Sequence, residues 1–146
     1  MLAYRTSLAL PEGEVSGQHP AVVYGKGHGA PTVLVVDDDP GIVALVGEAL
    51  AAGGYRVLAA EGAQALRLAR EVRPEVILLD LQMPRMGGEE VCRRLRAEPA
   101  TAAIPIVLMS GDAQLAAAAG ALGVEDRLPK PFKLSDLFVA VARWAG

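Results

Sequence analysis

The sequence predicts a single α/β domain built on a parallel sheet. From residue 32 onward, short β-branched runs alternate with stretches whose apolar residues recur at helical spacing. The chain has 146 residues, which fits one domain, and it is 52% hydrophobic and 21% charged, which suits a folded core. Because parallel strands need crossover connections, we expect helices on both faces of the sheet.

The periodicity places five strands and five helices in strict alternation. The strands are expected at residues 33–36, 56–59, 76–79, 104–109 and 124–128. The helices are expected at residues 41–52, 63–71, 89–98, 112–122 and 135–144. Gly53 and Gly54 end the first helix, and Ser135 is a candidate cap for the last.

Residues 1–31 lack any sustained helical or strand period. They are rich in glycine and proline, which is typical of linkers. We therefore interpret 1–31 as a flexible N-terminal tail or linker and 32–146 as the folded domain.

Composition excludes several classes of protein. Fourteen Lys and Arg residues against seventeen Asp and Glu give a net charge of −3, which does not favour direct binding to nucleic acid or to a membrane surface. No apolar run approaches the length of a membrane span. A single cysteine cannot form an intramolecular disulfide, so a cytoplasmic location is expected.

Polar residues follow the predicted strands at the points where ligands bind in parallel α/β sheets. Asp37 and Asp38 follow the first strand, Asp80 the third, Ser110 the fourth and Lys130 the fifth. Clustered carboxylates need a cation, and a ligand set of oxygens alone favours Mg²⁺ over Ca²⁺ or Mn²⁺. A carboxylate beside a metal ion, a hydroxyl and an ammonium group is the set needed for phosphoryl transfer to that carboxylate.

Four stretches of the sequence carry a resemblance to a known family. They are Val-Val-Asp-Asp-Asp-Pro at 35–40, Leu-Asp-Leu-Gln-Met-Pro-Arg-Met-Gly-Gly at 79–88, Ile-Val-Leu-Met-Ser-Gly at 106–111, and Leu-Pro-Lys-Pro-Phe at 128–132. In order, spacing and strand position, residues 32–146 resemble the receiver domains of two-component response regulators. The resemblance implies a flavodoxin-like, doubly wound five-stranded parallel sheet with strand order 2-1-3-4-5 and five helices.

The resemblance also implies roles for single residues. Asp80 would be the phosphoacceptor, and Ser110 and Lys130 would hold phosphoryl oxygens. The metal would be Mg²⁺, bound by Asp80, by Asp38 directly, by Asp37 through water, and by the backbone carbonyl of Gln82. We further expect a cis peptide bond between Lys130 and Pro131, which aims the lysine into the acidic crevice.

A receiver is a signalling module rather than an enzyme in its own right. The resemblance implies a sensor histidine kinase or phosphotransfer protein as the phosphoryl donor, and an output protein as the partner. The surface formed by residues 112–122, 124–128 and 135–144 would control partner binding or form a homodimer. We expect a stand-alone receiver, although a receiver at the end of a larger kinase would look similar.

Two positions depart from the family pattern. Arg127 stands where the family often has Tyr or Phe, so we expect it to stay at the surface, paired with Glu125 or with an acid of a partner. Ser110 and the loop after it would then report phosphorylation. Gly87 stands where the family often has Asp, which removes a side-chain cap from the third helix.

Two other functions remain open from the sequence. The first is a Mg²⁺-dependent phosphohydrolase of the haloacid dehalogenase type, whose Asp-x-Asp motif Asp37 and Asp39 could supply. The Thr or Val that should follow is missing, and the chain is too short for a cap domain. The second is a receiver-like scaffold that never becomes phosphorylated, which only Arg127 favours.

Overall fold

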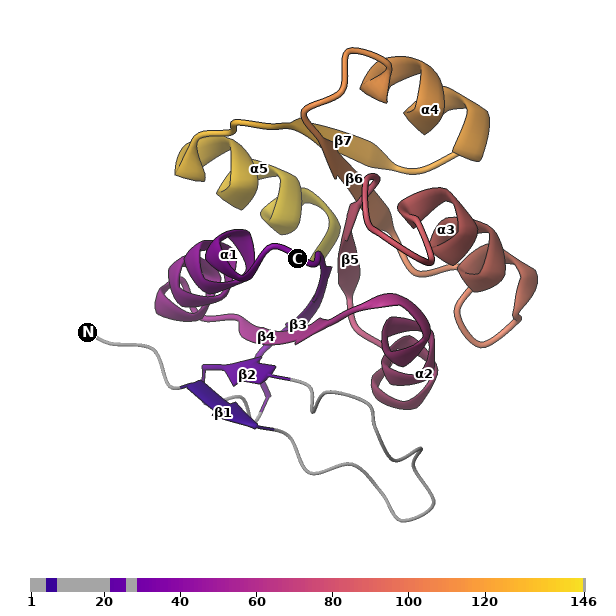
Figure 1. Ribbon diagram of the computed structural model, residues 1–146. Helices are drawn as coiled ribbons and strands as arrows, with labels where there is room; N and C mark the ends of the chain where they lie inside the picture. The colour runs from indigo at the N-terminus through magenta and orange to yellow at the C-terminus, as the bar shows by residue number, and fades with distance from the viewer. Residues whose placement is uncertain (1–4, 8–21, 26–28, 146) are drawn as a thin grey trace.

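A central sheet with helices on both faces forms the molecule (Figure 1). The structure, a computed structural model, describes residues 5–7, 22–25 and 29–145. The five predicted strands are present and parallel: β3 (Thr32–Val36), β4 (Arg56–Ala60), β5 (Val76–Asp80), β6 (Ile106–Ser110) and β7 (Asp126–Pro129). Their order is β4-β3-β5-β6-β7, which confirms the predicted order 2-1-3-4-5.

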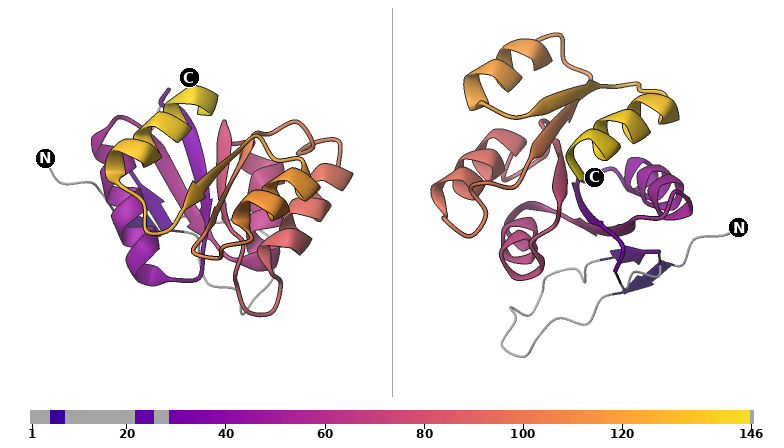
Figure 2. Two further views of the ribbon diagram at one scale, coloured as in Figure 1. Left: turned by 90° about the horizontal axis from the view of Figure 1, so that it is seen from above. Right: turned by 180° about the vertical axis from the view of Figure 1, so that it is seen from behind.

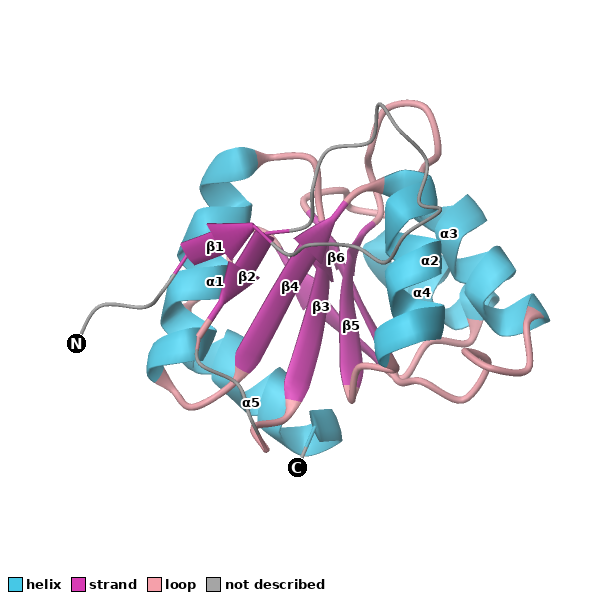
Figure 3. Ribbon diagram, turned by 90° about the horizontal axis from the view of Figure 1, so that it is seen from below, coloured by secondary structure: helices cyan, strands magenta, loops and turns pink. Residues whose placement is uncertain are grey.

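Five helices connect and cover these strands, as predicted. They are α1 (Pro40–Ala52), α2 (Gly62–Val72), α3 (Gly88–Ala97), α4 (Leu115–Leu122) and α5 (Leu134–Ala145). Helices α1 and α5 lie on one face of the sheet, and α2, α3 and α4 lie on the other (Figures 2 and 3). Every residue of β3, β5 and β6 is buried, so the middle of the sheet separates two hydrophobic clusters.

The helix boundaries follow local chemistry, with two corrections. Asp39 caps α1, because its Oδ1 accepts the Gly41 N–H at 2.8 Å, and α3 begins after Gly87 without a side-chain cap. Helix α5 begins at Leu134, so Ser135 lies inside its first turn and is not the cap that we predicted. Helix α4 begins at Leu115 rather than at 112, since the Asp112 side chain holds residues 112–114 in a turn.

The N-terminal segment contributes two strands that we did not predict. Strand β2 (Val22–Tyr24) pairs antiparallel with β4, and β1 (Arg5–Ser7) pairs antiparallel with β2. The sheet therefore has seven strands rather than five. Residues 5–7 and 22–24 are therefore strands and not the flexible tail that we predicted. Residues 1–4, 8–21 and 26–28 lie outside the described part of the chain.

Packing of one aromatic side chain explains why β2 forms. Tyr24 is only 1% exposed and joins the hydrophobic cluster beneath α1 and α5. Its ring lies against Gly47 of α1, where an added Cβ would overlap the ring atoms. The glycine thus provides the space that lets β2 close against the helix, and burial of the ring stabilises the strand.

Candidate functional site

The residues predicted to bind the metal ion or the phosphoryl group lie at or just after the carboxyl ends of the parallel strands. Asp37 follows β3, Asp80 is the last residue of β5, and Ser110 is the last residue of β6. Lys130 follows β7, and its backbone N–H donates to the Ser110 carbonyl oxygen at 2.8 Å. The topology therefore gathers at one edge residues that are far apart in sequence.

Three carboxylates form a cluster at this edge. One ligand oxygen from each of Asp37, Asp38 and Asp80 lies within 4.8 Å of the others. The side chain of Asp37 is fully buried and that of Asp80 is 6% exposed, whereas Asp38 is exposed to solvent. The cluster thus has a buried floor and one open side.

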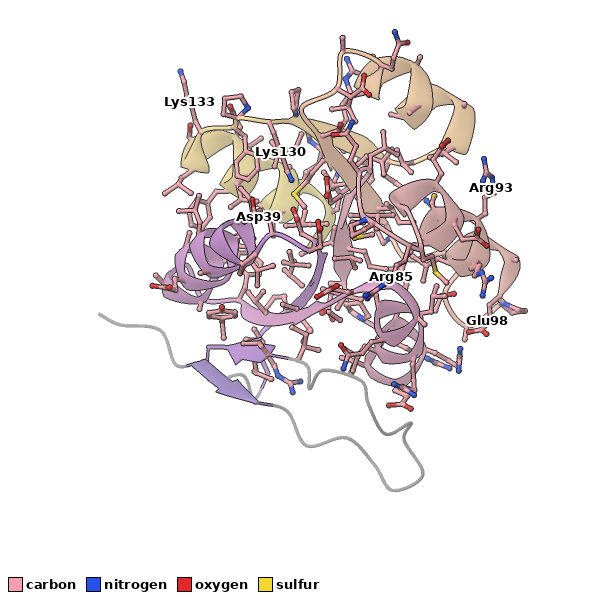
Figure 4. All side chains as sticks on the ribbon, viewed as in Figure 1. Asp39, Arg85, Arg93, Glu98, Lys130 and Lys133 are labelled. Carbon is pink, nitrogen blue, oxygen red and sulfur yellow. The ribbon has the colours of Figure 1, made fainter. Side chains whose placement is uncertain are left out.

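Lys130 extends into the cluster. Its Nζ lies 2.8 Å from Asp37 Oδ2 and 3.3 Å from Asp80 Oδ1. Figure 4 shows its side chain directed inward, whereas that of the nearby Lys133 points away from the molecule. Burial favours the neutral amine, but the hydrogen bonds and charges of Asp37 and Asp80 outweigh burial and raise the pKa of Lys130. The peptide bond from Lys130 to Pro131 is cis, as predicted.

The environment of Asp80 disfavours its charged form. Burial, followed by the nearby charge of Asp37, raises the pKa of Asp80 above its ordinary value. The Lys130 ammonium and a hydrogen bond from the Gln82 backbone N–H act in the opposite direction and do not fully compensate. A further positive charge beside Asp80 would favour the charged form of its carboxyl group.

The donor set fits a magnesium ion. Three carboxylates supply hard oxygen ligands, and exposed Asp38 leaves an open side where an ion could keep its water molecules. No histidine or cysteine belongs to the group, which disfavours softer metals. The role of the Gln82 carbonyl stays a prediction, and the exposed Gln82 side chain turns to Asp112, with its Nε2 3.2 Å from Asp112 Oδ2.

Ser110 ends β6, the strand that pairs with the Asp80-bearing strand β5, and its role toward a phosphoryl group stays a prediction. It is 1% exposed, and its Oγ accepts the Asp112 backbone N–H at 2.9 Å. The hydroxyl proton therefore remains available as a donor. Asp112 was missed from the sequence because it was interpreted as the first residue of a helix, although Ser-Gly-Asp after a strand is a turn signal.

Arg127 lies in β7 and is exposed, as we expected. The first expected partner, Glu125, is wrong, whereas pairing with an acid of a partner protein stays a prediction. Glu125 Oε1 instead lies 2.6 Å from Arg96 Nη2 and accepts the Ile106 backbone N–H at 2.8 Å. Arg96 comes from α3, so a tertiary contact takes the acid that the sequence places beside Arg127.

Gly88 packs closely against the backbone of Asp80. It begins α3, and its N–H donates to the Leu81 carbonyl oxygen at 3.2 Å. A Cβ at this position would overlap the Asp80 carbonyl oxygen. The glycine therefore lets α3 start directly behind the strand that carries Asp80.

None of the described helices is long and apolar enough to cross a bilayer.

Comparison with known sequences finds the response regulator receiver domain over residues 33–142. The relatives include RpaA of Synechocystis, a DNA-binding dual master transcriptional regulator, which is 36% identical over 76% of this chain and 47% of its own. The response regulator MprA of a Mycobacterium species is 42% identical over 72% of this chain and 46% of its own. The chain spans about half the length of these curated relatives.

Solved structures show the same architecture. The chemotaxis protein CheY4 of Vibrio cholerae superposes with a TM-score of 0.73 at 30% identity, covering 79% of this chain and 98% of CheY4. The receiver domain of the sensor histidine kinase PA1611 from Pseudomonas aeruginosa has a magnesium ion coordinated in its active-site cleft. It superposes with a TM-score of 0.74 at 30% identity, and the match covers 80% of this chain and 98% of the PA1611 domain. The fold, the acidic cluster and the sequence match agree, and the chain belongs to the response regulator receiver domains, which are signalling modules rather than conventional enzymes.

Proposed function

We propose that Asp80 accepts a phosphoryl group from the phosphohistidine of a sensor histidine kinase or phosphotransfer protein. The observation that carries this proposal is the buried Asp80 carboxyl, 3.3 Å from the Lys130 ammonium and within the acidic cluster. An Asp80 oxygen attacks phosphorus, the N–P bond breaks, and its electron pair remains on the histidine nitrogen. The product is an aspartyl phosphate.

Mg²⁺ fits this site as the cofactor: Asp38 and Asp80 would bind it directly, Asp37 would act through water, and the Gln82 backbone carbonyl would be a further ligand. When bound, the ion would neutralise charge on the phosphoryl oxygens. Lys130 holds one phosphoryl oxygen and Ser110 donates its hydroxyl proton to another. We no longer favour the haloacid dehalogenase alternative, because the sequence matches the receiver family over residues 33–142.

The surface formed by α4, β7 and α5 is the proposed output face. A groove of about 550 Å³ lies there, and its lining includes Ala116, Ala119, Gly120, Arg127 and Pro129. Its small apolar residues beside exposed charge suit a protein partner, either an output protein or a second copy of the chain. With a net charge of −3, the chain offers no general attraction to nucleic acid.

The acceptor is tested by intact mass after incubation with Mg²⁺ and acetyl phosphate. The wild-type protein should gain one phosphoryl group, and Asp80→Asn should gain none, because the amide has nearly the same shape but is not a nucleophile. Uptake by Asp80→Asn at the wild-type rate would show that another residue is the acceptor. No uptake by the wild-type protein would favour the phosphorylation-independent scaffold.

The metal site is tested with two neighbouring exposed acids. Asp38→Asn should lose the thermal stabilisation by Mg²⁺, whereas Asp39→Asn should keep it, because Asp39 caps α1 and Asn is an equally good cap. An ion at ten times its Kd adds about 1.4 kcal/mol to the free energy of unfolding. Equal responses of the two variants to Mg²⁺ would contradict the proposed ligand set.

A further inference from the structure

Strand β2 supports α1, the helix that follows the first two aspartates of the acidic cluster. Only three residues of α1 are buried, and one of them, Gly47, lies directly against the Tyr24 ring. One turn further along α1, a Cβ added to Gly25, which follows β2, would lie 3.4 Å from the Ala51 Cβ. Figure 3 shows β2 beside α1. Because positions 47 and 51 share one face of the helix, both contacts support the same side of α1.

The start of α1 is bonded to the acidic cluster through Asp39. Its Oδ1 accepts the Gly41 N–H at 2.8 Å, and its own N–H donates to Asp37 Oδ1 at 2.9 Å. The other oxygen of Asp37, Oδ2, lies 2.8 Å from Lys130 Nζ. Asp38 lies between Asp37 and Asp39 in the chain. A displacement of α1 therefore moves the backbone that carries two of the proposed metal ligands.

A cavity of about 160 Å³ brings β2 and these ligands to the same part of the molecule. Its lining includes Val22 and Tyr24 of β2, Val43 of α1, and the aspartates Asp37 and Asp38. The side chain of Asp37 is fully buried. Loss of β2 would therefore open this cavity further to water, as well as removing the support of α1.

We propose that Tyr24 is a positioning residue for the metal site, because its packing on α1 holds Asp37 and Asp38 in the arrangement that binds Mg²⁺. The inference rests on the proposed function. Ligands that are already in place lose little further conformational freedom when an ion binds, so the affinity is higher while β2 is docked. Coupling between two sites is reciprocal, so the bound ion strengthens the docking of β2 by the same factor. Undocking of β2 lowers the affinity for Mg²⁺.

An NMR titration of the full-length protein with MgCl₂ tests the inference by following the backbone amides of residues 37–39. The amide spectra also show whether each variant is folded. Tyr24→Ala should raise the Kd for Mg²⁺ about fivefold, the lower end of typical coupling between sites. Tyr24→Phe, which keeps the ring, should bind as the wild type does. Gly47→Ala leaves Tyr24 unchanged but places a methyl group where the ring lies, so it should also raise the Kd.

Leu95→Ala is the matched control for a general loss of stability. Leu95 is 2% exposed and belongs to the hydrophobic cluster beneath α2, α3 and α4, on the opposite face of the sheet from Tyr24. Its truncation should destabilise the fold to an extent similar to that of Tyr24→Ala. If Tyr24 positions the metal ligands, the Kd for Mg²⁺ should stay at the wild-type value in Leu95→Ala.

Hydrogen exchange of the β2 amides supplies a second measurement. In the wild-type protein, saturating Mg²⁺ should slow the exchange of the protected amides in Val22–Tyr24 about fivefold, the factor that reciprocal coupling requires. Asp38→Asn removes a proposed ligand of the ion, so its β2 amides should exchange at the same rate with and without Mg²⁺.

The outcomes separate this inference from the proposed function. If the wild-type protein does not bind Mg²⁺, the proposed metal site fails and the inference fails with it. If the wild type binds Mg²⁺ but Tyr24→Ala has the same Kd, or Leu95→Ala weakens binding as much, only the inference is overturned. Equal weakening in Tyr24→Phe would assign the effect to the hydroxyl group and would also overturn it. If Tyr24→Ala does not fold, Gly47→Ala and the exchange of the wild-type amides decide.

Discussion

The two edges of the sheet are built in different ways. At the β4 edge, β2 adds an antiparallel strand, with Val22 opposite Ala59 and Tyr24 opposite Val57, and the Tyr24 ring is buried against α1. At the opposite edge, β7 is the last strand of the described sheet, and Arg127 and Pro129 within it are exposed. Helix α4 beside β7 buries only Leu115 and Ala119.

The contrast indicates which end of the molecule can respond to a signal. Elements with few buried apolar contacts open most easily, and α4 with β7 meets that description. The β4 edge is instead held by backbone pairing and by a buried aromatic ring. We therefore expect phosphorylation of Asp80, on the central strand β5, to change the structure at the β7 edge while the β4 edge stays unchanged.

The largest expected effect is on the fixed edge. Tyr24→Ala should lower the free energy of unfolding by about 3–5 kcal/mol, as removal of a fully buried aromatic ring does. Denaturant unfolding measures the change, and Tyr24→Phe, which keeps the ring, is the control. A loss below about 1 kcal/mol for Tyr24→Ala would mean that β2 does not contribute to the core as described.

The contact between Tyr24 and Gly47 gives a smaller effect whose sign can be reversed. Gly47→Ala should destabilise the wild-type protein by about 1–3 kcal/mol, because the new methyl group overlaps the ring. In the Tyr24→Ala background the same change should stabilise by up to about 1 kcal/mol, since alanine favours the helix. The double-mutant cycle measures this coupling, and additive effects would contradict the contact.

Between the edges, Asp80 should give a stability effect that depends on pH. Its pKa in the folded state is raised above the ordinary 3.8, so the folded protein binds the proton more tightly than the unfolded chain does. The buried carboxylate therefore destabilises the fold above the folded-state pKa, and this effect vanishes below pH 3.8. Without Mg²⁺, Asp80→Asn should melt at a higher temperature than the wild type at pH 7, with a difference that shrinks on acidification. A constant difference across this range would contradict the raised pKa.

The smallest effect is expected at the open edge. Arg127→Ala should change the free energy of unfolding by no more than about 0.5 kcal/mol, because the side chain is exposed. Asp126→Ala is the matched comparison from the same strand. Asp126 Oδ2 accepts from Arg143 at 2.8 Å and from Trp144 at 3.2 Å, so its loss should have a larger effect, about 1 kcal/mol. Equal effects of the two variants would show that the described contacts of Asp126 add nothing.

The central fold was predictable because its signals are local and repeated. Strands β3 and β5 are near-continuous apolar runs, and the helices between them repeat their apolar residues at helical spacing. Strand β2 was not predictable, because three residues among glycines and prolines are too short to show a period. Its state depends on β4 and on the space left by Gly47, neither of which is near it in the sequence.

In the candidate site, too, some features could be predicted from the sequence and others could not. Asp37, Asp38, Asp80 and Lys130 could be found because each follows a predicted strand, and topology alone brings strand ends together. The partner of Glu125 could not be found, since Arg96 reaches it from a different helix. The same holds for Asp112, whose link to Gln82 joins loops 30 residues apart.

The unpredicted strand also has a consequence for solubility. An apolar edge strand with unpaired backbone groups is a template for aggregation, and β4 is buried at four of its five positions. With β2 in place, the outermost strand is β1, which has only three residues and is too short to recruit another chain efficiently. A protein shortened to begin at residue 32 would expose the β4 edge and, we expect, associate with itself through that edge. We therefore expect strands β1 and β2 to protect the β4 edge from aggregation.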